Sequence, residues 1–222
     1  IMDPIISVLE LVGVLISAGA WLCSLATTLM SSWLTLSNLL VTETLGVGLW
    51  ETCVLNQQGT LECRPYDSLL GLRPEIKLAR ILMCTALGVG MLGLLLAIPS
   101  LHLVNGCRQQ LEDVSCKRAL KATSGALWLV AGILGLIPVS YIAHVTVEQF
   151  FDESVPDMVP RWEFGDALFC GWTAGVLHLA AGMLLLISCF YVQKLNSNRP
   201  VDVPPVLTKL EPDSMRTRSE YV

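Results

Sequence analysis

The chain has 222 residues, of which 53% are hydrophobic and only 15% are charged, and its formal net charge is −5. A soluble domain carries about 25% charged residues, so the polar surface here is too small to cover a globule in water. This composition predicts an integral membrane protein. The net negative charge, without any basic run, excludes nucleic acid from the expected partners.

The N-terminal residues 1–6 contain no basic cluster, and no clear cleavage site follows them, so we expect no cleavable signal peptide. The loop charges described below place these residues in the cytoplasm. Four segments are apolar enough to cross a hydrocarbon core of about 30 Å as helices of roughly 20 residues. They are predicted at residues 7–30, 81–103, 119–142 and 167–192. Small residues such as Gly125, Gly135 and Gly182 favour close contact between these helices.

Charged residues near the segments set the predicted orientation. Lys and Arg are concentrated in the loop of residues 104–118, together with Lys121, and in the tail of residues 193–222. The loop of residues 143–166 has only Arg161 against several acidic residues. The basic loop and both termini are therefore expected in the cytoplasm, and the Pro-rich tail is expected to be disordered. Glu10, near the start of the first segment, is expected to reach the headgroups.

The first outer loop, residues 31–80, is the largest element outside the predicted membrane spans. Residues 47–55 and 60–66 are rich in β-formers and flank a turn, which predicts a strand pair, with a short helix around residues 68–70. Only two cysteines, Cys53 and Cys63, fall in the predicted outer regions. Because that compartment is oxidising, we predict a disulfide between them that contributes about 2–3 kcal/mol.

The remaining cysteines and the histidines do not form a chemical site. We expect the cysteines inside the spans to act as small apolar residues, and S-palmitoylation is left open at Cys107, Cys116 and Cys189 near the inner face. The three histidines stand apart, without paired carboxylates or metal-ligand spacing. With no catalytic motif present, we predict no enzyme, no metal and no cofactor.

One arrangement in the first outer loop is specific. Trp33 precedes Gly48, Leu49 and Trp50; Cys53 and Cys63 follow, and Arg80 closes the loop. This resembles the W–GLW–C–C motif of the claudin family and the arginine that follows it. Residues 66–72, 150–152 and 163–168 and the Tyr-Val ending are similar to other claudin segments. The resemblance covers residues 7–191 and the last two residues.

The resemblance implies a fold and a location. The fold is an integral-membrane, α-helical, left-handed four-helix bundle with a small extracellular antiparallel β-sheet, one strand of which comes from the second outer loop. The location is the plasma membrane at tight junctions of epithelial or endothelial cells. The implied function is cell–cell adhesion and control of paracellular permeability.

The resemblance also implies assembly contacts. Claudins polymerise side by side in one membrane, and Leu69 would insert against Phe150 and Phe151 of a neighbour; packing within one molecule is the alternative for these apolar side chains. Loop tips near residues 38–41 and 154–160 would meet the opposing cell. The expected partners are the chain itself and other claudins, in cis and in trans, within membrane lipid.

Arg64 directly follows the second motif cysteine, a position that bears on charge selectivity in claudins. A fixed cation beside a narrow aqueous path repels cations over a screening length of about 8 Å. We therefore expect a barrier or a weakly anion-favouring path. The alternative is that Arg64 only pairs with Glu62 or Asp67 on the surface.

The last three residues, Glu220, Tyr221 and Val222, present a free carboxylate and a terminal aliphatic side chain. Such a tail adds a strand to a PDZ groove, so PDZ scaffold proteins of the junctional plaque are expected partners.

A four-span auxiliary regulator of another channel, or a myelin-type adhesion protein, is the alternative function, because those families share the motif. The chain has no Asn-x-Ser/Thr site, which these proteins often carry in an outer loop, and its Tyr-Val ending favours the junctional interpretation.

Overall fold

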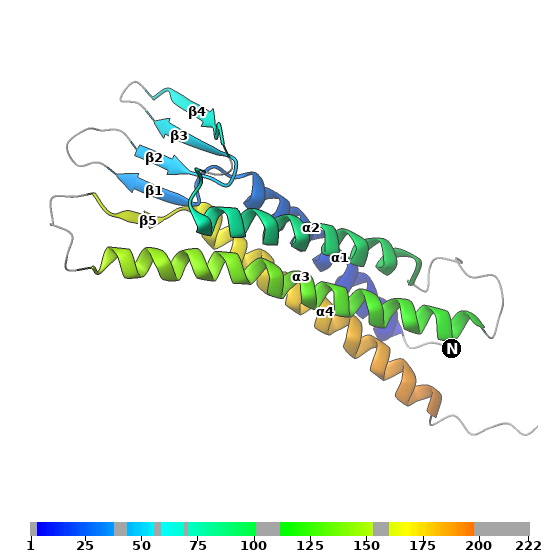
Figure 1. Ribbon diagram of the computed structural model, residues 1–222. Helices are drawn as coiled ribbons and strands as arrows, with labels where there is room; N and C mark the ends of the chain where they lie inside the picture. The colour runs from blue at the N-terminus through cyan, green and yellow to red at the C-terminus, as the bar shows by residue number, and fades with distance from the viewer. Residues whose placement is uncertain are drawn as a thin grey trace, which may run out of the picture.

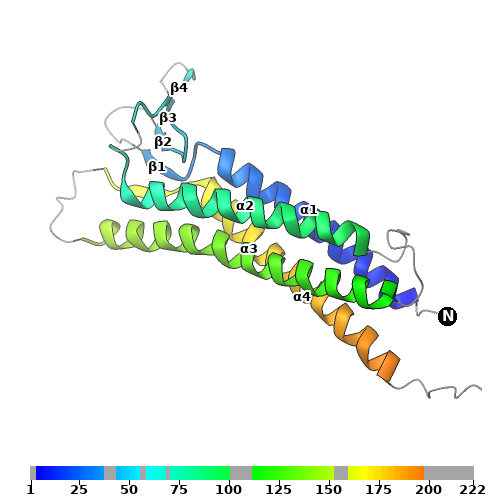
Figure 2. The same ribbon diagram turned by 45° about the vertical axis from the view of Figure 1, so that its right-hand side comes forward.

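The computed structural model describes residues 4–37, 44–55, 59–68, 71–100, 112–152 and 160–197. Four long helices lie side by side as a bundle, and a small sheet covers the end opposite the N-terminus (Figures 1 and 2). The helices are α1 (Pro4–Leu29), α2 (Pro74–Ser100), α3 (Glu112–Phe150) and α4 (Asp166–Ser197). Within the described residues, these are the four helices long and apolar enough to cross a membrane. The four-helix prediction is confirmed.

The helices extend beyond the apolar segments from which the sequence predicts them. Helix α2 begins at Pro74 rather than near residue 81, and α3 continues to Phe150 rather than ending near residue 142. Proline suits the first position of a helix, and an acidic residue such as Glu75 is favourable in the first turn. The spans that length and composition allow run over Pro74–Pro99 and Arg118–Phe150, so they include these additional turns.

The sheet has five antiparallel strands in the order β4-β3-β2-β1-β5. The strands are β1 (Leu34–Ser37), β2 (Thr44–Val47), β3 (Glu51–Leu55), β4 (Leu61–Pro65) and β5 (Trp162–Phe164). Strand β5 comes from the second outer loop, as the claudin resemblance implies. The predicted strand at residues 47–55 is wrong in one respect, because the chain turns at Gly48, whose N–H donates to the carbonyl of Glu51.

A hydrophobic cluster joins the sheet to the outer half of the bundle. From the sheet side it contains Trp33, Leu34 and Leu49, and from the helices it contains Ile76, Met83, Val139, Ile142 and Leu168. Fully burying one such side chain stabilises the fold by about 1.5–3 kcal/mol. The sheet is therefore packed onto the helices as part of one body. The short helix expected around residues 68–70 is not formed at Ser68, and Leu69 and Leu70 lie outside the described residues.

Glu10 corrects a prediction. Instead of reaching the headgroups, its side chain is only 2% exposed and forms an ion pair with Lys121 of α3. The hydroxyl of Ser188 donates to the same carboxylate oxygen over 3.3 Å. The orientation of Lys121 into the bundle explains the difference, since Glu10 finds a counter-charge inside the protein.

Two of the predicted close-contact glycines face each other between α3 and α4. A Cβ placed on Gly182 would lie 2.9 Å from the carbonyl oxygen of Gly125 and 2.9 Å from Cγ of Leu129. Gly135, on α3, has no described atom within 4 Å of the corresponding position. Close approach therefore explains Gly182, whereas it does not explain Gly135.

We expect Gly182→Ala to lower the free energy of unfolding by about 1–3 kcal/mol, because overpacking pushes the backbones of α3 and α4 apart. The matched control is Gly135→Ala, which we expect to be neutral or stabilising, since alanine favours a helix by about 0.5–1 kcal/mol. Thermal unfolding of the purified protein in detergent measures both. Equal stability of the two variants would contradict the close contact.

Candidate functional site at the sheet end of the bundle

The two motif tryptophans bind the last turn of α1. The final carbonyls of a helix have no partner within the helix, and leaving them unpaired near lipid is costly. The indole N–H of Trp33 donates to the carbonyl of Thr27 over 3.0 Å, and that of Trp50 donates to the carbonyl of Thr28 over 2.9 Å. Trp33 is 2% exposed and Trp50 is 42% exposed. The tryptophans thus seat the sheet on α1.

Arg80 connects α2 to the same turn of the sheet. Its Nε–H donates to the carbonyl of Leu49. Its guanidinium carbon lies 4.9 Å from the ring centroid of Trp50 and 5.3 Å from that of Tyr66. A planar guanidinium both stacks on aromatic rings and donates hydrogen bonds. Arg80 therefore contacts both aromatic rings and the backbone of the turn at Leu49, and so links α2 to the sheet.

Contacts of Gly48, Leu49 and Tyr66 explain why this turn is tight. Leu49 is fully buried in the hydrophobic cluster, and the hydroxyl of Tyr66 donates to the carbonyl of Gly48 over 3.0 Å. A Cβ on Gly48 would lie only 2.5 Å from the Cα of Ser31. Glycine is needed here because two backbone segments approach closely.

The predicted disulfide between Cys53 and Cys63 is formed. The two residues are direct partners in the β3–β4 ladder, and Cys53 is buried. All five residues of β4 are exposed, so this strand packs little against the rest of the protein. The covalent link therefore holds the free edge of the sheet in place.

Arg64 lies on this edge strand. Direct cross-strand partners project from the same face of a sheet, and one such row runs through Phe164, Leu34, Val47, Thr52 and Arg64. The first three members of the row contact the hydrophobic cluster, whereas Arg64 is exposed beyond it. Neither Glu62 nor Asp67, both of which are described, forms an ion pair with Arg64 within 4.0 Å. The alternative in which Arg64 pairs with Glu62 or Asp67 on the surface is therefore not observed in this structure.

An apolar pocket of about 360 Å³ opens between the outer end of α3 and β5. Its lining residues are Thr146, Val147, Phe150, Phe151, Trp162, Glu163 and Phe164. The Thr146 hydroxyl donates to the carbonyl of Ile142, so this polar group is already satisfied. Phe151 is 73% exposed and Phe150 is 36% exposed. The pocket is therefore an accessible surface for an apolar side chain.

Two arginines support the walls of the pocket. Arg161 donates to the carbonyl of Phe150 near the end of α3, and its guanidinium carbon lies 5.5 Å from the centroid of that ring. Arg73, just before α2, places its guanidinium carbon 5.2 Å from the ring centroid of Trp162. A cation beside the C-terminal carbonyls of a helix is favourable. These contacts orient two aromatic side chains of the lining.

The structure brings together most residues that the motif singles out and adds several that it does not contain. Phe150 and Phe151 lie side by side, with ring centroids 5.3 Å apart. Sequence reasoning missed the contributions of Tyr66, Arg73, Arg161 and the Thr27–Thr28 carbonyls, because these contacts join different elements of the folded chain. Leu69, the loop tips at residues 38–41 and 154–159, and Glu220, Tyr221 and Val222 lie outside the described residues.

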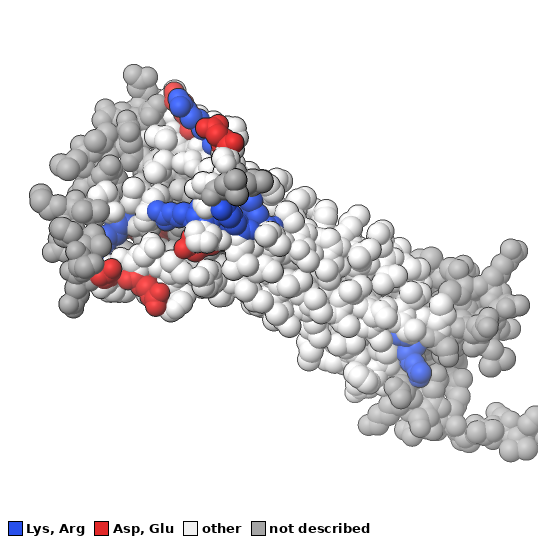
Figure 3. All heavy atoms as spheres, in the orientation of Figure 1, with Lys and Arg blue, Asp and Glu red and all other residues white. Residues whose placement is uncertain are grey.

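These features define a class: a four-span membrane protein that carries a disulfide-linked sheet at one end of its helix bundle. The face shown in Figure 3 has charged side chains near both ends and a broad uncharged band between them. An uncharged band of this kind is what lipid contact requires.

Comparison with known proteins identifies the family. Residues 7–185 match the model of the PMP-22/EMP/MP20/Claudin family. Claudin-3 of Rattus norvegicus is 31% identical over 185 residues, which cover 82% of each chain. Claudin-4 of Homo sapiens is 33% identical over 186 residues, which cover 82% of this chain and 86% of the relative. The chain belongs to the PMP-22/EMP/MP20/Claudin family, and its claudin resemblance is confirmed.

Family membership and the four spans identify a multi-pass plasma-membrane protein with a junctional function of the general claudin kind.

We expect Arg80→Lys to lower the free energy of unfolding by about 1–2 kcal/mol, because lysine keeps the charge but loses the planar stacking on Trp50 and Tyr66. Arg64→Lys is the matched control: it is the same substitution on the edge strand β4, at an exposed side chain that forms no ion pair with a described residue. Thermal unfolding in detergent compares the two variants. If both retain wild-type stability, the clamp at Arg80 does not stabilise the sheet.

Proposed function

We propose that the chain is a component of tight-junction strands. It polymerises within one membrane, adheres to the opposing cell and controls the paracellular passage of ions and small solutes. The observation that carries this proposal is the accessible apolar pocket beside Phe151, on a protein whose sheet is fixed to its helices. Family membership supports the same function.

Side-by-side assembly uses the pocket as a receptor. In the proposed contact, Leu69 of one molecule inserts against Phe150 and Phe151 of its neighbour. Both phenylalanines keep exposed surface in the single chain, which argues against packing within the molecule as their main role. A contact between two different surfaces of the same protein leaves each end open to a further copy, so it generates a linear polymer.

The proposed partners follow from the same arrangement. They are further copies of the chain and other claudins in the same membrane. Across the intercellular space, the loop tips at residues 38–41 and 154–160 make the contacts. Residues 220–222 bind a PDZ scaffold, and lipid surrounds the exposed apolar side chains of the helices. A channel regulator or a myelin-type adhesion protein is less favoured, because the relatives reported above are claudins.

Arg64 gives the assembled strand its proposed charge preference. Its guanidinium lies on the exposed edge strand and is not neutralised by an ion pair with Glu62 or Asp67. Side chains two residues apart on a strand share a face, so Glu62 is the nearest counter-charge along β4. The proposed path therefore repels cations at Arg64, and it acts as a barrier or favours anions weakly.

We expect Arg64→Asp to raise the sodium-to-chloride permeability ratio by roughly twofold or more, since reversing one screened charge near the path changes the ion energy by a few tenths of a kcal/mol. Dilution potentials across an epithelial monolayer with few endogenous claudins measure this ratio. Glu62→Gln, on the same face of β4, should shift the ratio in the opposite direction. Unchanged ratios in both variants, with normal delivery to cell contacts, would exclude this face from the path.

We expect Phe151→Ala to reduce strand formation strongly while leaving surface delivery intact, because the pocket loses its most exposed wall. Freeze-fracture imaging of transfected fibroblasts, which lack their own strands, measures strand length. The matched control is Phe190→Ala, at a phenylalanine that is 66% exposed near the other end of α4. If the two variants form strands equally well, the pocket does not mediate assembly.

A further inference from the structure

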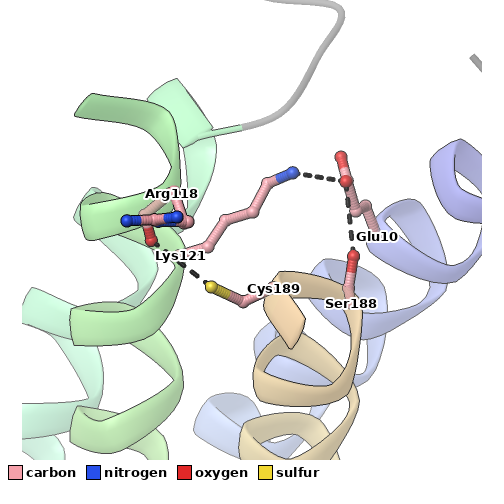
Figure 4. A network of polar contacts seen from close by, with 5 residues as sticks. All are labelled: Glu10, Arg118, Lys121, Ser188 and Cys189. Carbon is pink, nitrogen blue, oxygen red and sulfur yellow. Dashed lines mark hydrogen bonds and ion pairs between the residues drawn. The ribbon is translucent and has the colours of Figure 1, made fainter. Parts of the chain in front are cut away.

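A polar contact joins three helices at the end of the bundle opposite the sheet. The ammonium of Lys121 (α3) forms an ion pair with Oε1 of Glu10 (α1), and the hydroxyl of Ser188 (α4) donates to the same oxygen over 3.3 Å (Figure 4). The side chains of Lys121 and Glu10 are only 4% and 2% exposed, and Ser188 is fully buried.

The ion pair crosses the bundle diagonally. Helix α1 packs against α4 and, to a smaller extent, α2, whereas α3 packs against α2 and α4. Lys121 extends from α3 across the Ser188–Cys189 turn of α4 to reach Glu10 on α1 (Figure 4). The pair therefore links two helices that do not pack along each other.

The apolar contacts between these helices do little to determine which helix packs against which. Lipid tails are as apolar as leucine, so burying leucine between helices gains little hydrophobic free energy in a membrane. A buried charge, by contrast, is strongly unfavourable unless its partner is present. Oε2 of Glu10 has no hydrogen-bond partner among the described residues, so this carboxylate depends on Lys121 and Ser188. An arrangement that separates Glu10 from Lys121 would leave both charges without their partners.

We propose that Glu10, Lys121 and Ser188 form a clasp that selects this helix arrangement by fixing the inner end of α1 to α3 and α4. The clasp complements other polar contacts of α1, among them the bond from the Trp21 indole N–H to the carbonyl of Leu87 in α2 over 3.1 Å. About one turn before the outer end, Ser24 and His178 are hydrogen-bonded over 2.7 Å, and at the outer end the carbonyls of Thr27 and Thr28 accept the indole bonds. The clasp thus helps to position the helix that carries the sheet.

Single and paired substitutions in the full chain test the clasp. Lys121→Met and Glu10→Gln each remove one charge, and Lys121→Met leaves a buried carboxylate without its counter-charge. We expect Lys121→Met to lower the melting temperature in detergent by about 6 °C or more, because breaking a buried ion pair is strongly destabilising. Thr123→Val is the matched control, since the exposed Thr123 hydroxyl bonds only the backbone of its own helix.

Two double variants separate pairing from general damage. Glu10→Lys with Lys121→Glu restores opposite charges, and Glu10→Leu with Lys121→Leu removes both charges. We expect at least one of them to recover half or more of the melting temperature and surface delivery lost in Lys121→Met. The proposal is overturned if Lys121→Met matches the Thr123→Val control, or if neither double variant is more stable than Lys121→Met. Neither readout depends on strand formation, so the proposed junctional function is tested separately.

Discussion

The end of α1 is the constraint on which the outer half of this protein depends. A helix that ends close to lipid must find donors for its last carbonyls. Here the indole N–H groups of Trp33 and Trp50 supply them. These tryptophans belong to the segments before β1 and before β3. The hydrogen bonds that satisfy the carbonyls at the end of α1 therefore also fix the sheet to this helix. Arg80 then joins the same turn to α2. The motif is thus a connected set of hydrogen bonds and ring contacts.

A fixed sheet gives the two proposed functional surfaces a defined separation. The free edge strand carries Arg64, and the pocket lies at the opposite edge, where β5 meets α3. Between them, the row from Phe164 to Val47 packs on the helices. A polymer with a regular repeat requires that each copy present both surfaces in the same relative position. The hydrophobic cluster below the sheet provides that rigidity.

The sequence was sufficient to predict the features that follow from the surroundings of the chain, namely lipid and an oxidising compartment. Lipid requires long apolar helices, and an oxidising compartment favours the bond between Cys53 and Cys63, so both were predicted correctly. Helix ends were not predictable in the same way, since α3 continues into polar residues up to Phe150. The turn at Gly48 was also missed within a run of β-formers, because the close approach of Ser31 involves a residue that is distant along the chain. Tertiary contact decided these details.

Glu10 illustrates why the remaining features escaped the sequence. Its position near a helix end suggested the headgroups, and Lys121, which lies 111 residues away, counted as one more cytoplasmic charge. Only the rotation of α3 about its axis decides whether that lysine points outward or into the bundle, and the nearly uniform apolarity of the helix hides this rotation from the sequence. In water, a hydrophobic stripe would reveal it. In lipid, both faces of a helix are apolar, so a few polar contacts specify the arrangement that many apolar contacts then stabilise.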